Sequence, residues 1–180
     1  RRPASTMVTL GVSGGIMLSF LAALDPGDEV LIPDPYFVMY KHVATMLGIT
    51  AVCYDLYPDF RLRRSALERA VSPRTRAILV NTPANPTGGI VRREELAKLV
   101  AGLEKHPQVA VLSDEIYARL IYDGERHASL LEFESIRDRL IVLDGWSKTF
   151  SMTGWRLGWG LWPKQWAAAA ERLQINSTSC

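Results

Sequence analysis

The sequence is 180 residues long, with 48% hydrophobic and 22% charged side chains and a formal net charge of +2 at pH 7. This balance is typical of an ordinary globular domain, and the length suffices for one sizeable core. The small net charge gives no reason to expect nucleic acid or an acidic membrane surface as a partner. No apolar run reaches membrane-spanning length, so no membrane association is expected.

Short apolar runs alternate with longer helical stretches along the chain. Residues 77–80, 109–112 and 140–143 are continuous runs of Val, Ile, Leu and Ala, a pattern typical of strands buried on both faces of a parallel sheet. Alternation of such strands with helices predicts a three-layer α/β/α domain with a mainly parallel sheet. The expected strands are Met7–Leu10, Glu29–Ile32, Ala51–Leu56, Ala77–Asn81, Val109–Leu112, Leu140–Leu143 and Arg156–Trp162.

Several of the intervening helices have recognisable ends. The turn Asp25-Pro-Gly-Asp28 is expected to end a helix that begins near Gly14. Ser65 precedes Glu68 by three positions, the spacing of a capping box at a helix start. Further helices are expected at Arg93–Leu103, where apolar side chains recur on one face, and at Trp166–Leu173.

The two cysteines, Cys53 and Cys180, lie far apart and lack the spacing of metal ligands. We interpret Cys53 as a small core residue and Cys180 as a chain end. A reducing, cytoplasmic compartment is therefore expected, and no metal site is predicted. The sequence opens at Arg1 without a methionine and stops within Asn176–Cys180, which suggests a fragment of a longer protein.

Ligands of parallel sheets bind beyond the carboxyl ends of the strands, so polar residues there are candidates for a site. The first expected strand runs into Gly11-Val12-Ser13-Gly14-Gly15. Glycines let backbone amides approach an anion closely, and a helix N-terminus favours negative charge. The loop has neither the Lys-Ser/Thr ending of a Walker A loop nor a dinucleotide fingerprint. It predicts either half of a phosphate-binding cup, with the Ser13 hydroxyl as a ligand, or a simple tight turn.

Three further strand ends carry aromatic or polar side chains. Asp34-Pro35-Tyr36-Phe37 offers an aromatic wall for a flat ligand, or only core packing. Asn85 lies in the proline-stiffened loop Asn81–Gly88, where its amide could donate to a ring oxygen or merely cap a turn. Asp114 comes directly after Ser113, which follows four apolar residues, so its carboxylate needs a partner, either a protonated ring nitrogen or a helix start that it caps. Tyr117 follows on the next turn and could reach the same ligand.

A lysine and an arginine follow the sixth expected strand. Lys148 comes shortly after the apolar run Leu140–Leu143, and Arg156 follows eight residues later. Desolvation and nearby cations lower the pKa of a lysine and make it a nucleophile for carbonyls, while an arginine suits a phosphate. The pair suggests a lysine that forms an imine with a phosphorylated aldehyde, although an ordinary surface lysine is the simpler alternative.

Taken together, these residues resemble the class I/II aminotransferases, pyridoxal 5'-phosphate (PLP) enzymes of fold type I, of the aspartate aminotransferase kind. The resemblance covers nearly the whole chain in the family's order. It implies that residues 1–180 form the core of the large, catalytic, PLP-binding domain, without the N-terminal segment and the C-terminal small domain. The phrases that carry it are Asp25-Pro-Gly-Asp-Glu-Val30, Asn85-Pro-Thr-Gly88, Ser113-Asp-Glu-Ile-Tyr117, and Ser147-Lys148 followed by Gly154-Trp-Arg-Leu-Gly158.

The resemblance also implies individual roles. Lys148 would hold PLP as a Schiff base and shuttle a proton, while Asp114 would keep the pyridine nitrogen protonated and the ring an electron sink. Asn85 and Tyr117 would hydrogen-bond the phenolic oxygen of the ring, and Phe37 would stack on it. The expected catalytic residues are Lys148, Asp114 and Tyr117, and the phosphate ligands are the amides of Val12 and Ser13, the Ser13 hydroxyl and Arg156.

The implied activity is the transfer of an amino group between an α-amino acid and a 2-oxo acid. The resemblance also implies a homodimer in the full-length protein, with active sites that borrow residues across the interface. One position departs from the pattern: many relatives have a phosphate-binding serine three positions before the lysine, and this chain has Gly145. Phosphate binding is therefore expected to depend more on Ser13 and Arg156.

Other functions remain open at the level of sequence. Within fold type I, the same residues serve C–S lyases and decarboxylases, and aminotransferase-like domains also act as non-catalytic PLP-binding sensors. Gly11-Val-Ser13-Gly-Gly15 also matches the nucleophile elbow of a serine hydrolase. Asp114 and His127 follow it in the Ser…Asp…His order, but that interpretation leaves Lys148 and Arg156 without a role.

Overall fold

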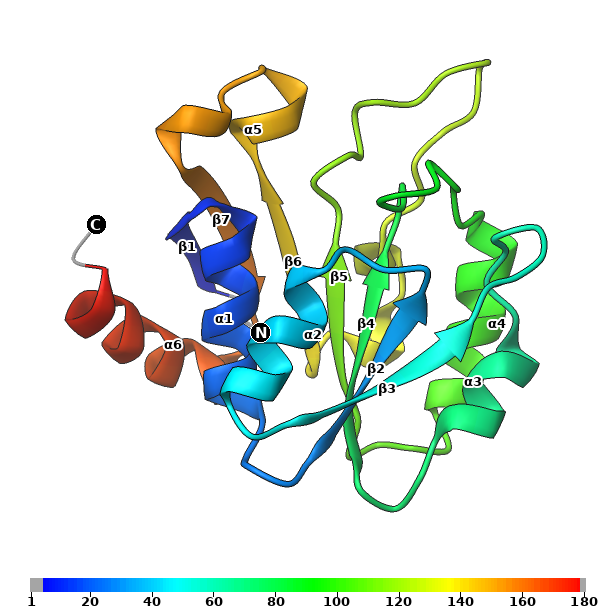
Figure 1. Cartoon of the computed structure of the whole chain (residues 1–180), viewed down its shortest axis with the longest axis horizontal. Coiled ribbons are helices and arrows are strands. Elements are labelled where there is room, and N and C mark those ends of the chain that lie inside the picture. The colour runs from blue at the N-terminus through cyan, green and yellow to red at the C-terminus, as the bar shows by residue number, and fades with distance from the viewer. Residues whose placement is uncertain (1–4, 179–180) are drawn as a thin grey trace.

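A computed structural model describes residues 5–178 of the chain. Its seven strands form one sheet in the order β1-β7-β6-β5-β4-β2-β3 (Figure 1). The strands are β1 (Ser5–Leu10), β2 (Glu29–Asp34), β3 (Thr50–Asp55), β4 (Thr75–Asn81), β5 (Ala110–Asp114), β6 (Leu140–Gly145) and β7 (Leu157–Trp162).

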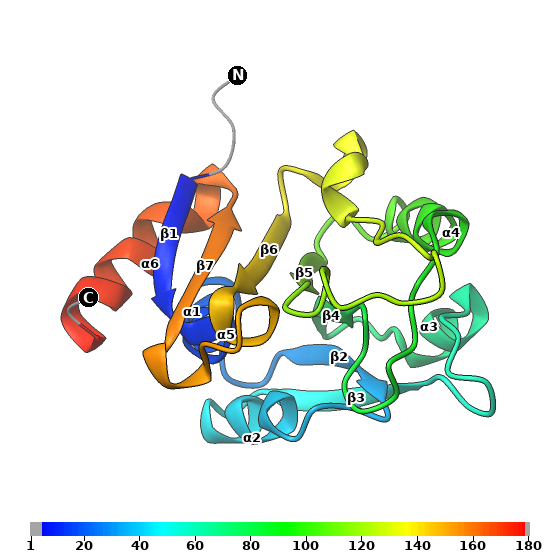
Figure 2. The ribbon, with the colours of Figure 1, turned by 90° about the horizontal axis from the view of Figure 1, so that it is seen from above.

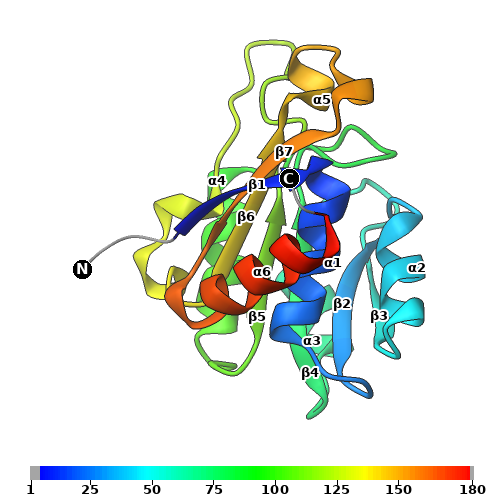
Figure 3. The same cartoon turned by 90° about the vertical axis from the view of Figure 1, so that its left-hand side faces the viewer.

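Helices cover both faces of this sheet (Figures 2 and 3). Side chains of α1, α2 and α6 pack on one face, and side chains of α3 and α4 pack on the other. The three-layer α/β/α prediction is confirmed. The helices are α1 (Gly11–Ala23), α2 (Met39–Met46), α3 (Arg64–Ala70), α4 (Arg93–Leu103), α5 (Trp146–Thr149) and α6 (Lys164–Ser177), with short 3₁₀ helices η1 (Leu130–Glu132), η2 (Glu134–Ile136) and η3 (Thr153–Trp155).

The sheet is mainly parallel. The pairs β3–β2, β2–β4, β4–β5 and β5–β6 are parallel, whereas β6–β7 and β7–β1 are antiparallel. Two successive antiparallel pairings restore the original direction, so β1 runs the same way as the central strands. The ends of β1, β2, β4, β5 and β6 and the start of β7 therefore share one edge, on which Figure 2 looks down.

The central strands are buried on both faces, as their continuous apolar sequences predict. Every residue of β5 and all but Asp144 of β6 are buried. Alternate side chains of each strand enter opposite cores, since period-two geometry turns neighbours to opposite faces. Leu112 packs with α1 and α2, whereas Val111 packs with α3 and α4. Two apolar cores thus hold the strand ends in place.

Some expected local features differ from the structure. The first helix begins at Gly11 rather than near Gly14, so the glycine-rich run forms its first turn. Ser65 does not cap α3, because the helix starts one residue earlier at Arg64, whose guanidinium pairs with Glu68 at 2.7 Å. Helix α2 was not expected at all, since no capping residue marks its start.

Cys53 is exposed, in contrast to its prediction as a core residue. It lies on β3, the last strand of the sheet in the described part of the chain. Burial on an edge strand depends on whether a helix extends over that side chain, which an apolar pattern does not reveal. Cys180 lies outside the described residues. Across residues 5–178, no helix is both long and apolar enough to cross a membrane.

Candidate functional site

A cavity of about 250 Å³ opens at the shared strand edge. Its walls come from segments that are far apart in the sequence and that the sheet order brings together (Figure 2). All eight residues that the sequence singled out line it: Val12, Ser13, Phe37, Asn85, Asp114, Tyr117, Lys148 and Arg156. Five further residues complete the wall, namely Ile16, Tyr40, Ile116, Ser147 and Thr153.

The N-terminus of α1 forms one end of the cavity. The preceding residue, Leu10, offers no side-chain acceptor to the first helical amides, which are left without intrahelical partners in any α-helix. Gly11 adopts a positive φ of +67°, and a Cβ there would lie 2.6 Å from the Nη2 atom of Arg156. The guanidinium thus lies against the open helix start, and together they make a cup suited to an anion.

A second glycine allows this close approach. Gly158 pairs with Thr9 across the β1–β7 ladder, and a Cβ on Gly158 would lie 2.5 Å from the carbonyl carbon of Gly11. The start of β7 can therefore touch the start of α1. Arg156 precedes this strand in a left-handed conformation, φ +51°, which costs a non-glycine residue energy. Its Nη1 atom donates to the Thr153 carbonyl at 3.0 Å, which orients the guanidinium.

Asp114 forms the floor of the cavity at the end of β5. Its Oδ2 atom accepts a 2.7 Å hydrogen bond from the hydroxyl of Tyr40, and Oδ1 accepts one from the Ile116 amide. Burial raises the pKa of Asp114 to about 6, because desolvation outweighs these two hydrogen bonds. Burial beside the carboxylate likewise raises the pKa of Tyr40 well above its usual value. Burial makes this carboxyl harder to ionise, so a cationic group of a ligand beside it would stabilise the ionised form.

Asn85 and Tyr117 form a polar wall beside Asp114. The Asn85 side-chain amide donates to the Tyr117 hydroxyl at 3.4 Å. Asn81 holds this arrangement in place. Its Oδ1 atom accepts a hydrogen bond from the backbone N–H of Asn85 at 2.8 Å, and its Nδ2 atom donates one to the Asp114 carbonyl at 3.0 Å. Both side chains therefore present donors to the cavity, as an anionic ring oxygen requires.

Lys148 lies in α5, directly after β6, and its side chain is exposed. Its Nζ atom is 5.9 Å from the centre of the Tyr117 ring. The lysine that the sequence places at the mouth of a buried strand is thus exposed in the described part of the chain. Lys148 nevertheless lines the same cavity as Arg156, so an aldehyde and a phosphate of one ligand could reach the two side chains together.

Sequence reasoning missed Tyr40. The hydrogen bond from Tyr40 to Asp114 joins positions 74 residues apart, and it depends on α2, a helix that was not expected. The aromatic ring of Phe37 packs edge-on against Tyr40, with centroids 5.7 Å apart. The one available signal was the three-residue spacing of these aromatics, which lie in the turn that leads into α2, where the Tyr40 amide donates to the Phe37 carbonyl at 3.0 Å.

The serine hydrolase alternative is wrong for this structure. Ser13 and Asp114 line the cavity, but His127 is not part of its wall. The Nε2 atom of His127 instead meets the Glu115 carboxylate at 2.8 Å, on the other face of β5. The Ser…Asp…His order in the sequence therefore does not correspond to an assembled triad.

Gly145 ends β6 and has no room for a side chain. A Cβ there would lie 2.9 Å from the Leu157 carbonyl oxygen and 3.0 Å from the Gly158 Cα. We expect Gly145→Ser to lower the free energy of unfolding by about 1–3 kcal/mol and to add no phosphate contact. Urea unfolding measures the loss. Gly154→Ser is the matched control, since nothing lies within 4 Å of a Cβ there; equal losses in both variants would contradict this account.

Comparison with known proteins yields consistent matches. The family model described as "Aminotransferase class I and II" matches residues 1–180. The chain is 37% identical to a bifunctional aspartate aminotransferase and glutamate/aspartate-prephenate aminotransferase of Petunia hybrida, over 98% of this chain and 37% of the relative. It is 38% identical to an aspartate/prephenate aminotransferase of Cereibacter sphaeroides, over 96% of this chain and 44% of the relative.

Solved structures agree with the sequence matches. The aromatic aminotransferase from Pyrococcus horikoshii superposes with a TM-score of 0.94 at 35% identity, over 98% of this chain and 48% of the other. The N-succinyldiaminopimelate aminotransferase from Mycobacterium tuberculosis gives a TM-score of 0.92 at 34% identity, over 97% and 46%. The chain thus spans less than half the length of these relatives.

Proposed function

Because this chain belongs to the class I and II aminotransferase family, whose members depend on PLP, we propose that it is the cofactor-binding core of an aminotransferase. Residues 1–180 correspond to the core of the large domain. The full-length protein moves an amino group between an α-amino acid and a 2-oxo acid, as a homodimer in the cytoplasm. Transamination is favoured over elimination or decarboxylation, since the relatives named above are aminotransferases.

The cavity residues fit PLP on three separate grounds. The uncapped start of α1 and the guanidinium of Arg156 suit its phosphate. The carboxyl of Asp114, whose pKa burial raises to about 6, gains from a cationic ring nitrogen beside it. The donors of Asn85 and Tyr117 suit the ring oxygen. The observation that carries the proposal is this combination around one cavity that also contains Lys148.

When bound, PLP supplies an aldehyde that reacts with amines and a ring that withdraws electrons from the substrate. The protein's own residues supply the rest. Lys148 would hold the aldehyde end of the cofactor and could then carry the proton that leaves and returns at the substrate α-carbon. Asp114, whose carboxylate Tyr40 orients, would keep the ring nitrogen protonated. Phe37 would lie against the ring, and Ser13 and Arg156 would hold the phosphate.

The direct test is covalent labelling of the full-length protein. PLP is added, the complex is reduced with borohydride, and digested peptides are mapped by mass spectrometry. We expect one pyridoxyl group, on the peptide that contains Lys148, and a visible absorption band that disappears on reduction. Labels spread over several lysines in proportion to their exposure, with no saturation as PLP is added, would contradict the proposal.

A further inference from the structure

Glu115 is a buried carboxylate on the opposite face of β5 from the cavity. It follows Asp114 directly, and strand alternation turns the two side chains apart. Its Oε1 atom accepts hydrogen bonds from the hydroxyls of Ser113 at 2.8 Å and Ser129 at 2.9 Å, and its Oε2 atom meets Nε2 of His127 at 2.8 Å. Only 6% of the residue is exposed. A carboxylate removed from water in this way needs such partners to remain in place.

The main chain of Glu115 carries Tyr117. The Glu115 amide donates to the Leu143 carbonyl at 2.8 Å, which ties the residue to β6. Its carbonyl accepts from the Ala118 amide at 2.8 Å, and the Tyr117 carbonyl accepts from the Leu120 amide at the same distance. One turn, from 115 to 118, therefore starts at Glu115, and a second, from 117 to 120, starts at Tyr117, so Tyr117 belongs to both.

The segment that follows these turns is long and has no helix or strand of its own until η1 begins at Leu130. It returns to the sheet at His127 and Ser129, which both bond to the Glu115 side chain, as Ser113 on β5 also does. One carboxylate thus fastens both ends of the segment from 116 to 129. In Figure 1 the segment rises beyond the ends of β4 and β5.

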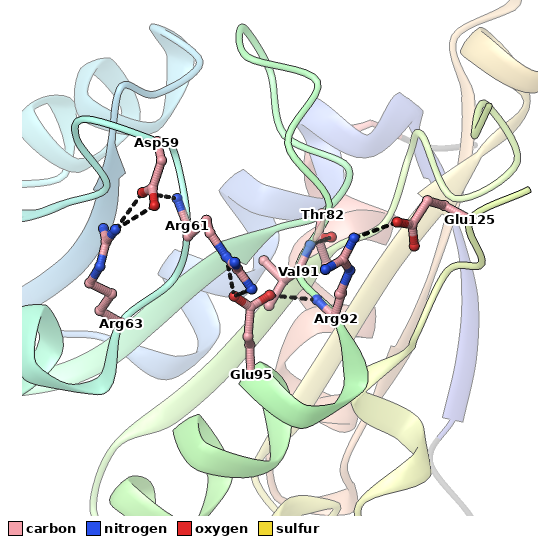
Figure 4. A network of polar contacts seen from close by, with 8 residues as sticks. All are labelled: Asp59, Arg61, Arg63, Thr82, Val91, Arg92, Glu95 and Glu125. Carbon is pink, nitrogen blue, oxygen red and sulfur yellow. Dashed lines mark hydrogen bonds and ion pairs between the residues drawn. The ribbon is translucent and has the colours of Figure 1, made fainter. Parts of the chain in front are cut away.

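A second contact, an ion pair, holds the same segment and is exposed. Arg92 pairs with Glu125 at 2.5 Å, with side chains 55% and 39% exposed (Figure 4). The same view shows Thr82 accepting from the Val91 amide, which closes the neighbouring loop. Exposed ion pairs contribute little to stability. We therefore expect the buried contacts of Glu115 with His127 and Ser129 to hold the segment more strongly than the Arg92–Glu125 pair does. Glu115 and Glu125 both hold this segment, one buried and one exposed, so a variant of Glu125 serves as the control for a variant of Glu115.

We propose that Glu115 is a positioning residue: through His127 and Ser129 it holds the turn that places the Tyr117 hydroxyl within reach of Asn85 and of the cofactor. That Glu115 holds the turn concerns only the described chain. That the turn places Tyr117 against PLP rests on the proposed function. Misplacement of a contacting group by about 1 Å can cost up to about a hundredfold in rate, so loss of the junction is expected to slow turnover by roughly ten- to a hundredfold.

The first measurement is hydrogen exchange in the full-length protein without added PLP, on peptides that cover residues 116–122. We expect Glu115→Ala to speed exchange at the amides of Ala118 and Leu120 at least about tenfold, since local opening needs less free energy there. Glu125→Gln, the exposed control, should leave this exchange unchanged. Unchanged exchange in Glu115→Ala, or equal acceleration in both variants, would overturn the positioning role.

The second measurement follows the visible band of bound PLP against pH. A donor bond to the ring oxygen stabilises its anionic form, so loss of that bond should move the spectral midpoint to higher pH. We expect Tyr117→Phe and Glu115→Ala to move it in the same direction. In the double variant Tyr117→Phe/Glu115→Ala, the second substitution should add little to the shift of the midpoint, because both residues act through one contact. Fully additive shifts, or no shift in Glu115→Ala, would overturn the proposal.

A third variant guards against failure to fold. If Glu115→Ala does not fold, the single variant Ser129→Ala removes one partner and leaves the carboxylate bonded to Ser113 and His127, and the same two readouts apply, with smaller changes in the same directions. A wild-type protein that binds no PLP would refute the proposed function. Hydrogen exchange, which needs no cofactor, would still decide whether Glu115 holds the Tyr117 turn.

Discussion

Replacement of Lys148 by alanine is expected to reduce turnover of the full-length protein to background. Proton transfer by a positioned group contributes about 10²–10⁴-fold to a rate, and the covalent hold on the cofactor is lost in addition. Because Lys148 is exposed, the free energy of unfolding should change by no more than about 0.5 kcal/mol. Steady-state assays with paired amino and oxo acids, together with thermal unfolding, measure both effects.

Lys98 provides the control for this experiment. It is also exposed but lies on α4, across the sheet from the helices that line the cavity. Lys98→Ala should keep both the turnover and the borohydride-stable label. Activity near the wild-type level in Lys148→Ala, or an equal loss in Lys98→Ala, would remove Lys148 from its proposed role.

Asp114→Asn is expected to stabilise the cofactor-free protein at high pH while it strongly lowers turnover. The folded pKa is about 6 and the ordinary value is 3.8, so the folded state keeps the proton to higher pH than the unfolded chain. The contribution of the protonated Asp114 carboxyl to the free energy of unfolding is therefore fully present below about pH 4. It is lost as the pH rises past about 6, and the free energy of unfolding falls by about 3 kcal/mol at most. Asparagine has no proton to lose and avoids this loss.

Urea unfolding of wild type and variant at pH 4, 5, 6, 7 and 8 tests this expectation. The difference in stability should grow in favour of Asp114→Asn between about pH 4 and 6 and then remain constant. Asp25→Asn, an exposed carboxyl in the turn after α1, should follow the wild type. Turnover should fall because a neutral amide does not keep the ring nitrogen protonated. Parallel stability curves for Asp114→Asn and wild type would contradict the burial argument.

The sequence predicted the sheet and the cavity residues for a simple physical reason. Parallel strands place their carboxyl ends on one edge, so Asp114 at the end of β5 and Lys148 just after β6 had to lie near each other. The apolar runs marked these strands clearly, because strands buried on both faces contain few polar residues. Their exact ends were harder to predict, since β5 continues through Ser113 and Asp114, whose polar side chains find partners inside the protein.

What the sequence did not show were contacts between distant segments. Tyr40 reaches Asp114 through a helix without a capping signal. Glu115 stands beside Asp114 in the sequence, yet its partners His127 and Ser129 become apparent only once the segment returns to the sheet. The start of α3 differs from the prediction for a local reason, since the helix begins at Arg64 and no side chain caps it. For Tyr40 and Glu115, a tertiary contact that no local pattern reveals determines the role of the side chain.

The anion cup has a consequence for the order of folding. Its helix start follows β1, near the beginning of the described chain, and its guanidinium precedes β7, near the end. Within residues 5–178, β1 pairs only with β7, so it cannot join the sheet until almost the whole chain is present, and closing so long a loop is slow. A nascent chain still lacking β7 has no cup. An anion bound there, as proposed for the phosphate, would therefore report on completion of the fold and would tie β1 to β7.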